Sequence, residues 1–526
     1  MTMTKHFMSI NGGKLSDGSV EIPGEQVEVH YAKRTDGIPE YSDFALADSF
    51  AAKYGNVFRH VTNRGEWYHY DGKVWSPDEK LHRYTSARSV CADVARIYSK
   101  EESIKKLLTH ANTIADVIKV AGYDAGLKSL IDDFDKNPML LNTQDGIVDL
   151  RDGSLQKHAP GHYLSKITSC GVGGECPTWL QFLEDATCGD KELQAYLKRV
   201  IGYALTGSIQ EHALFFLYGS GANGKSVFIG VIAGILNTYH RTAAMQTFIV
   251  STSDQHPTDV AGLVGSRAVS ASETERGRTW DENKIKTITG GDELSARFMR
   301  GDFFEYVPQF KILIAGNNKP KLKSTDEAIR RRFNLIPFLA TIPKEKRDPL
   351  LGEKLKAEYP GILKWAIKGC LEWQRDGLNP PAIVREATEE YINSQNVVSN
   401  WIEERCDKGR GCKATAGELY ADFKEWTRTT GEEILKQVDF TTALEGMRYF
   451  SKKTNIGRVW DGLKLRQAVK SDGSDGSRHW YRIARNLYTV PIGSVVTVVT
   501  THQDTARGDT TDGLKTGPIS KARLLK

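Results

Sequence analysis

Residues 219–226 have the composition of a loop that holds phosphate groups. They match the pattern G-x-x-x-x-G-K-[ST] at every fixed position, as Gly219-Ser220-Gly221-Ala222-Asn223-Gly224-Lys225-Ser226. Glycines let backbone N–H groups turn towards phosphate oxygens, the lysine reaches the β- and γ-phosphates, and the serine hydroxyl can ligate Mg²⁺. A helix predicted from Val227 onwards adds its positive N-terminal dipole. We therefore predict a site for ATP and Mg²⁺ from Gly219 to Val227.

Two carboxylates follow the next apolar run. Residues 267–271 predict a buried strand, and Glu273 and Glu275 come soon after it. Phosphoryl transfer at a loop of this type uses a carboxylate near the metal, at the end of a strand next to that of the loop, and a group that positions the attacking water. We expect Glu273 to join Ser226 at Mg²⁺, and Glu275 to position water. The alternative is that both are surface glutamates at a strand exit.

An amide side chain follows a third predicted strand, residues 310–315. We expect this strand to end beside the phosphate loop, so that Asn317 can sense the γ-phosphate or hold water. An asparagine that forms a turn before Pro320 is the alternative.

Three consecutive arginines, Arg330, Arg331 and Arg332, lie beyond it in a helix predicted to begin at residues 325–327. An arginine that neutralises charge on the transferring phosphate is a regular part of phosphoryl transfer. Three adjacent residues of a helix cannot all face one partner, so at least one should face solvent. We prefer Arg332 for this role and then Arg331.

In order and spacing, these motifs resemble superfamily 3 helicases, in particular the phage/plasmid and poxvirus-type group that is often fused to primases. The resemblance rests on the phosphate loop and on Ala271-Ser272-Glu273-Thr274-Glu275, Thr289-Gly290-Gly291-Asp292, Gly316-Asn317-Asn318-Lys319-Pro320 and Arg331-Arg332. It implies an AAA+ core, a hexameric ring with ATP sites between subunits, and 3′-to-5′ movement on single-stranded DNA.

A hairpin is predicted over residues 293–308, with Arg297 and Arg300 near its tip. A ring would aim such hairpins into its channel, so we expect both arginines to bind DNA; a solvated charged hairpin is the alternative. The basic residues that follow are consistent with phosphate contact. They are Lys311, Lys319, Lys321 and Lys323.

The expected fold class is α/β, with an AAA+ P-loop core of a parallel sheet flanked by helices over residues 205–345. A flexible arm (1–40), a mixed α+β accessory domain (41–176) and a helical lead-in (177–204) precede it. A helical connection (346–394), a winged-helix-like DNA-binding module (395–486) and a tail (487–526) follow it. Within these segments we predict helices over 45–54, 86–108 and 382–393, hairpins over 67–75 and around Gly457 and Asp461-Gly462, and a meander over 140–153.

Lys and Arg outnumber Asp and Glu by only 71 to 66, so net charge alone does not identify a nucleic-acid partner. Without an apolar span or signal peptide, we expect a cytoplasmic protein without membrane contact. We predict an ATP-dependent replicative helicase of a phage, satellite or plasmid, a hexamer that acts on single-stranded DNA and forked duplex. The alternatives are a primase-helicase with a cryptic or partner primase, and an initiator that binds origin DNA. Asp132-Asp133-Phe134-Asp135 and Asp149-Leu150-Arg151-Asp152 could imitate the metal-binding acidic pair of a primase, but neither has the expected companions.

Overall fold

The computed structural model of the 526-residue chain describes residues 37–250, 258–273, 277–299, 301–323, 326–432, 434–455 and 457–466. Most of the predicted arm and all of the predicted tail lie outside the described residues, as do Glu275, Arg300 and the side chain of Glu273. By their contacts, residues up to Leu463 form one unit and those from Lys464 a second. In the described ranges, no helix has the length and apolar character that a membrane span requires.

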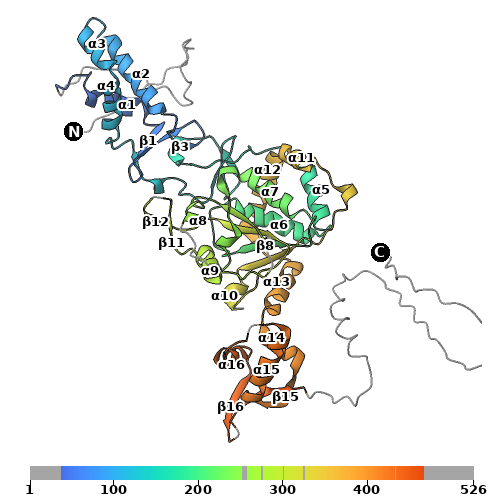
Figure 1. Ribbon diagram of the computed structural model, residues 1–526. Helices are drawn as coiled ribbons and strands as arrows, with labels where there is room; N and C mark the ends of the chain where they lie inside the picture. Colours follow the sequence, from blue (N-terminus) through green and yellow to red (C-terminus); the bar gives the residue numbers. More distant parts are fainter. Residues whose placement is uncertain are drawn as a thin grey trace, which may run out of the picture. The chain divides into compact units, whose positions relative to one another are not determined.

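A parallel five-stranded sheet forms the centre of the predicted core (Figure 1). Its strands are β8 (Leu214–Tyr218), β9 (His240–Thr242), β10 (Ala268–Glu273), β13 (Lys311–Gly316) and β14 (Phe333–Pro337). They lie in the order β14-β8-β13-β10-β9, and every neighbouring pair is parallel. Strands β13 and β14 are buried throughout, as expected for a parallel sheet that is covered on both faces. The predicted parallel sheet is confirmed, and β9 and β14 are additions to the prediction.

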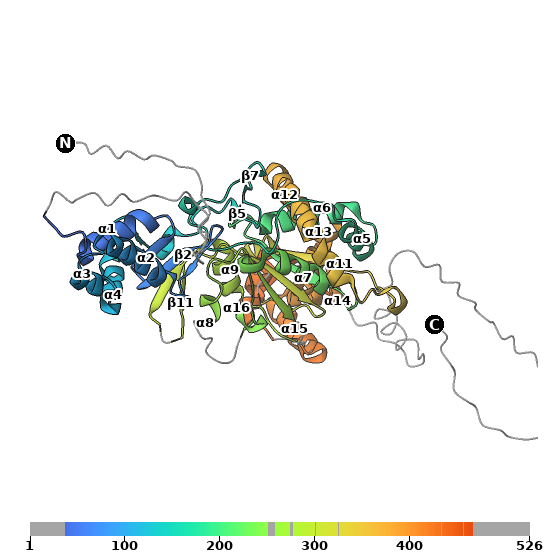
Figure 2. The same cartoon turned by 90° about the horizontal axis from the view of Figure 1, so that it is seen from above.

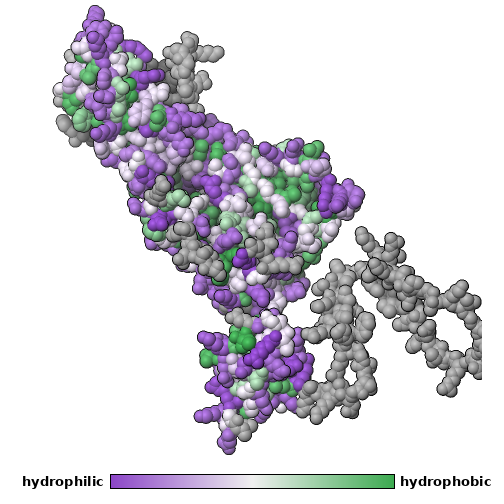
Figure 3. Space-filling view, viewed as in Figure 1, coloured by the Kyte–Doolittle hydropathy of each residue, from purple (hydrophilic) through white to green (hydrophobic). Residues whose placement is uncertain are grey.

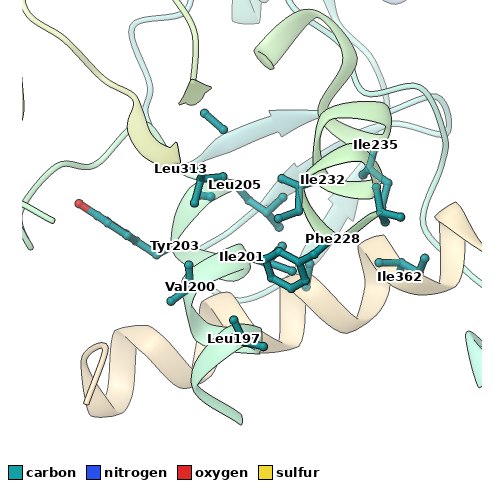
Figure 4. Close-up of a cluster of buried hydrophobic side chains, with 14 of the residues drawn as sticks. Leu197, Val200, Ile201, Tyr203, Leu205, Phe228, Ile232, Ile235, Leu313 and Ile362 are labelled. Carbon is teal, nitrogen blue, oxygen red and sulfur yellow. The ribbon is translucent and has the colours of Figure 1, made fainter. Parts of the chain in front are cut away.

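Helices cover both faces of this sheet (Figure 2). Alternate residues of β8 belong to different cores: Phe215 and Leu217 lie in one, and Leu214 and Phe216 lie in the other. The first core is completed by α5 (Pro177–Ala186), α6 (Lys191–Ala204), α7 (Lys225–Leu236), α11 (Leu351–Ala357) and α12 (Tyr359–Asp376). Figure 4 shows the apolar side chains that α6 and α7 place against each other and against Ile362 of α12. The second core is completed by α9 (Glu282–Gly290), α10 (Glu327–Arg330) and α13 (Ala382–Ser394).

Residues 43–134 have a hydrophobic core of their own. The helices are α1 (Asp43–Tyr54), α2 (His82–Ile97), α3 (Glu102–Leu108) and α4 (Ala111–Ala121), and the strands are β1 (Phe58–Val61), β2 (Glu66–Tyr70), β3 (Trp75–Pro77) and β4 (Lys128–Ser129). The predicted hairpin over 67–75 is the antiparallel pair β2 and β3. The single helix predicted over 86–108 is wrong: it is divided by a turn in which the Glu101 N–H donates to the Tyr98 carbonyl (3.0 Å).

The predicted meander is confirmed as β5 (Leu140–Asn142), β6 (Ile147–Asp149) and β7 (Ser154–Gln156), all antiparallel. The aspartates considered as a metal pair have other partners. Asp133 is 2.8 Å from Lys136 Nζ, and Asp149 is 2.6 Å from Arg151 Nη2. Among the residues that the structure describes, no three His, Cys, Asp or Glu side chains form a group that could hold a metal.

Residues 397–465 alternate helices and strands in the order helix, strand, two helices, two strands. The elements are α14 (Val397–Arg405), β15 (Cys406–Thr415), α15 (Ala416–Thr430), α16 (Gln437–Gly446), β16 (Phe450–Thr454) and β17 (Gly457–Leu465), with sheet order β15-β17-β16. The rings of Trp401, Phe423 and Phe440 pack together at centroid distances of 4.7–5.8 Å. The hairpin turn precedes Gly457, whereas Asp461-Gly462, which was also expected to mark the hairpin, lies inside β17.

Candidate nucleotide-binding site

The carboxyl ends of the parallel strands bring three predicted site segments to one edge of the sheet. In the register, Glu273 pairs with Gly316, Gly316 with Tyr218, and Tyr218 with Pro337. The phosphate loop and Asn317 therefore begin one residue beyond this line, and the Glu273 backbone lies on it. One detail differs from the sequence argument, which placed Glu273 on a strand next to that of the loop. Strand β13 lies between β10 and β8, so Glu273 is one strand further away.

The loop backbone has a conformation that the sequence specifies through its glycines. Gly221, Ala222 and Gly224 have φ of 104°, 52° and 88°, in the left-handed region that favours glycine. A Cβ at Gly219 would lie 2.2 Å from the carbonyl oxygen of Phe338, so no side chain fits there. The same carbonyl accepts a hydrogen bond from Asn223 Nδ2 (2.8 Å). The residue after β14 therefore holds the loop in place.

Lys225, the first residue of α7, is buried with its ammonium group inside the loop. Its Nζ donates to the Gly219 carbonyl (3.0 Å), to Asn223 Oδ1 (2.9 Å) and to Asn317 Oδ1 (3.2 Å). All three acceptors are uncharged. Burial lowers the pKa of Lys225, because the charged form loses solvation without an opposite charge to replace it. Lys225 and Asn317 are thus brought into contact from segments far apart in the chain.

The other residues at this edge fit a nucleoside triphosphate with Mg²⁺. Ser226 is exposed in the first turn of α7, where its hydroxyl is open to a ligand, and Ser220 and Ala222 expose the outer side of the loop. A serine hydroxyl and a carboxylate supply the hard oxygen ligands that Mg²⁺ prefers. The N-terminus of α7 provides further positive potential for phosphate.

The three arginines separate into three environments and one of them faces solvent, as expected, although the helix predicted to contain all three ends at the first. Helix α10 ends at Arg330, which forms an ion pair with Glu389 of α13. Arg331 follows the helix and is exposed. Arg332 is 7% exposed, and its guanidinium donates to Thr289 Oγ1 (3.0 Å) and the Ala328 carbonyl (2.8 Å). Burial, and then the neighbouring Arg331, lower the pKa of Arg332.

The predicted hairpin is confirmed as β11 (Leu294–Arg297) and β12 (Phe303–Tyr306), an antiparallel pair. The Arg297 guanidinium lies over the Phe303 ring, 4.8 Å from its centroid. Sequence reasoning considered only the arginines and missed the apolar residues that the hairpin exposes. Met299 is 83% and Phe303 is 60% exposed. The signal was present in the aromatic residues on both sides of the turn, because a solvated loop seldom carries several of them.

One lysine considered for phosphate contact was assigned wrongly. Lys311 is the first residue of β13 and is buried, so it cannot reach a ligand at the surface. Its ammonium donates to the carbonyls of Ser208 (3.2 Å), Gln309 (3.3 Å) and Thr206, just beyond the end of α6. The adjacent Arg267, also buried, donates to the carbonyls of Leu205 (2.6 Å) and Leu140 (2.5 Å). Both cations satisfy interior carbonyls at the amino ends of the strands, away from the phosphate loop.

Two protein-family models match parts of the chain. One, described as "D5 N terminal like", matches residues 47–188, and the other, a "family of unknown function (DUF5906)", matches residues 217–332. The second match begins just before the phosphate loop and ends at Arg332. It therefore covers every proposed ATP-site residue.

Curated relatives come from large DNA viruses and a virophage. "Putative helicase L207/L206" of Acanthamoeba polyphaga mimivirus is 25% identical over 322 residues, which are 56% of this chain and 33% of that protein. "Putative helicase 022R" of Frog virus 3 is 25% identical over 45% of this chain and 26% of its own length. This chain is similar to viral proteins named putative helicases. "Putative helicase V13" of Sputnik virophage is 23% identical over 50% of this chain and 36% of its own length.

The helicase resemblance that the motifs indicated is thus confirmed at the level of homologous proteins, and the chain spans about a third of the length of these relatives. Among solved structures, "The A form apo structure of NrS-1 C terminal region-CTR" is similar with a TM-score of 0.46 and 10% identity, over 81% of this chain and 99% of that one.

Proposed function

We propose that this chain is an ATP-dependent DNA helicase, a ring-forming motor that moves 3′ to 5′ on single-stranded DNA. The observation that carries the proposal is the meeting of Lys225 and Asn317 inside a glycine loop at the carboxyl edge of the parallel sheet. Such an edge is where α/β proteins bind their ligands. Homology to proteins named helicases supports DNA unwinding as the work that ATP hydrolysis drives.

In this proposal the residues of the loop hold the triphosphate. The N–H groups from Gly219 to Val227 surround the phosphates, and the Lys225 ammonium turns from its three neutral acceptors to the phosphate oxygens. Ser226 and Glu273 hold Mg²⁺, which when bound neutralises phosphate charge. Asn317 and Glu275 orient the attacking water.

Arg331 is the better candidate for the arginine that acts on a neighbouring subunit's ATP. The sequence preference was Arg332, but that side chain is committed to Thr289 and Ala328 of its own chain. An arginine that works in trans has to be exposed before the neighbour binds, and Arg331 is exposed directly beside the buried one.

The β11–β12 hairpin is the proposed contact for single-stranded DNA. Arg297 and Arg300 would bind phosphates, while exposed Phe298 and Phe303 offer flat surfaces on which bases can stack. The Arg297 cation lies over the Phe303 ring, and this pairing suits single-stranded DNA, in which charged phosphates alternate with aromatic bases.

The element order of residues 397–465 supports assignment as a winged-helix-like DNA-binding module. The proposed ring is a hexamer, and a primase is a proposed partner. An initiator that binds origin DNA is the alternative function. A primase would be supplied by a further domain or by a separate protein.

Unwinding assays test the proposal directly. The chain should hydrolyse ATP faster with single-stranded DNA and should open a forked duplex that carries a 3′ tail but not one that carries only a 5′ tail. Glu273→Gln should bind ATP yet fail in both reactions, while Lys364→Ala, a distant surface change, should match the parent. Hydrolysis that DNA does not stimulate, with no unwinding, would reject the motor.

A further inference from the structure

The C-terminal module separates its charges by secondary structure. Strands β15, β16 and β17 carry seven Lys or Arg and two Asp or Glu, whereas helices α14, α15 and α16 carry three and seven. The basic residues of the strands are Lys408, Arg410, Lys413, Lys452, Lys453, Arg458 and Lys464. The positive charge of this small fold is thus concentrated in its strands.

By element order, helix α16 corresponds to the helix that a winged-helix module inserts into a DNA groove, yet its residues do not suit DNA. Between residues 437 and 446 it has no Lys or Arg, and it carries Asp439 and Glu445, both exposed. Phosphates repel carboxylates, and the guanine edge in the major groove offers acceptors that favour Arg or Lys. Its exposed Val438 adds no polar contact.

The β16–β17 hairpin has the opposite character. Lys453 lies directly across from Arg458 near the turn, and like charges in that arrangement repel each other. Within the described part of the chain, neither has a carboxylate at ion-pair distance. The Thr454 hydroxyl donates to the Gly457 carbonyl (2.8 Å) and closes the turn. In Figure 3 the end of this hairpin, at the foot of the view, is hydrophilic.

The opposite face of the sheet from Lys453 and Arg458 is also positive, because neighbouring residues of a strand point to opposite faces. Asp461 of β17 lies between two lysines, 3.6 Å from Lys413 of β15 and 3.9 Å from Lys452 of β16. One carboxylate therefore serves two ammonium groups and leaves a net positive charge across three strands. Phe450, opposite Asp461 in the register, is 70% exposed on the same face.

We propose that the β16–β17 hairpin and its sheet, rather than helix α16, bind the phosphate backbone of double-stranded DNA without regard to sequence. The proposal rests on the DNA-binding role proposed above for this module. A duplex presents two rows of phosphates with about one charge per 1.7 Å, a density that suits a hairpin with cations on both faces. Binding would also relieve the repulsion between Lys453 and Arg458.

Duplex binding by the full chain tests the proposal. Affinity for two blunt duplexes of unrelated sequence is measured by fluorescence anisotropy over a range of salt concentrations. The double variant Lys453→Ala/Arg458→Ala should weaken binding to both duplexes equally and reduce the slope of log affinity against log salt by about two, near 0.9 per phosphate contact. The control Arg428→Ala/Lys436→Ala removes two exposed cations from the helical side and should keep the parent slope.

An unchanged salt slope in the hairpin variant would overturn the proposal. So would a changed preference between the two duplexes in the α16 variant Gln437→Ala/Thr442→Ala, because that result would show that α16 reads the DNA sequence. Thermal unfolding checks the fold, and the hairpin variant should be no less stable than the parent because a repulsive pair is removed. If alanine unfolds the module, Lys453→Gln/Arg458→Gln replaces it with the same expectation.

The proposed motor function and the proposed duplex contact of the β16–β17 hairpin can be rejected separately. The hairpin variant should retain ATP hydrolysis stimulated by single-stranded DNA, and Lys225→Ala should bind duplex with the parent slope. A parent chain that binds duplex through the hairpin but never hydrolyses ATP would reject the motor alone. A chain that hydrolyses ATP but shows no hairpin dependence would reject the hairpin alone.

Discussion

At the carboxyl ends of β8 and β13, Lys225 and Asn317 meet inside the phosphate loop, whereas at the amino ends of β13 and β10, Lys311 and Arg267 meet the carbonyls beyond α6. Both lysines are buried, and burial lowers the pKa of each. Lys225 lies next to exposed residues such as Ser226. Lys311 is enclosed by backbone carbonyls that accept hydrogen bonds from its ammonium group. A buried cation is therefore a functional candidate only when a ligand can reach it.

The largest expected effect is on ATP hydrolysis, which should require Lys225. Lys225→Ala should abolish ATP hydrolysis, because the phosphates lose their lysine. The unfolding temperature should stay near that of the parent, because two of the three acceptors, on Gly219 and Asn317, belong to residues that are not buried. The measurement is steady-state phosphate release together with thermal unfolding. If Lys225→Ala instead unfolds the protein, the lysine holds the loop together and the contrast with Lys311 disappears.

The two neighbouring arginines provide a similar contrast. Arg331→Ala should lower hydrolysis by about 10³- to 10⁵-fold with unchanged stability, as expected for loss of an arginine that acts on the transferring phosphate. Arg332→Ala should mainly destabilise, by about 1–3 kcal/mol, because it leaves buried acceptors unpaired.

Subunit mixing tests whether Arg331 acts between subunits. Rings that combine Lys225→Ala and Arg331→Ala subunits contain some complete sites, so two inactive proteins should recover part of the activity. No recovery at any ratio, after confirmed subunit exchange, would argue against action in trans.

Lys311→Ala should reduce the free energy of unfolding by about 2–4 kcal/mol, because the carbonyls of Ser208 and Thr206 would lose a buried donor. Chemical denaturation measures the loss. A variant as stable as the parent would show that water replaces the ammonium and that the amino edge of the sheet is more open than its burial indicates.

The pH dependence of stability should reveal the lowered pKa of Lys311 in the folded chain. Burial, and then Arg267, hold the Lys311 pKa well below its ordinary value, so the folded chain binds fewer protons than the unfolded chain. The stability of the parent relative to Lys311→Met should therefore rise with pH towards about 10.4, the pKa of an unfolded lysine. Denaturation midpoints of both proteins at pH 7, 8 and 9 provide the comparison, and parallel curves would contradict it.

The smallest effects are expected in the β11–β12 hairpin, where each substitution removes one proposed DNA contact from an exposed surface. Arg297→Ala should reduce the salt slope for single-stranded DNA by about one, and Phe303→Ala should weaken binding by about 1–3 kcal/mol without changing that slope. Basal hydrolysis should survive in both. A slope change in Phe303→Ala would mean that the ring acts only by placing Arg297.

Apolar runs made strands β8, β10 and β13 predictable, since each is a short buried segment followed by glycine or polar residues. Strand β14 was missed because Asn334 and Pro337 interrupt its run; as an edge strand it tolerates a final proline. The phosphate loop is a local pattern and needed no tertiary information. The burial of Arg332 and Lys311 depends on Thr289 and on the end of α6, and adjacent letters cannot show such distant partners.

Strand β14 connects the two ends of the proposed machinery. Arg331 lies two residues before the strand, and Phe338, whose carbonyl touches the phosphate loop, lies just after it. At about 3.3 Å per residue, the five residues of β14 span about 17 Å. All five residues of β14 are buried and paired with β8, so the strand should move as one unit. If nucleotide exchange shifts the loop, β14 would transmit the shift to Arg331, the arginine proposed to act on the next subunit. Occupancy of one ATP site would then change the hydrolysis rate at its neighbour.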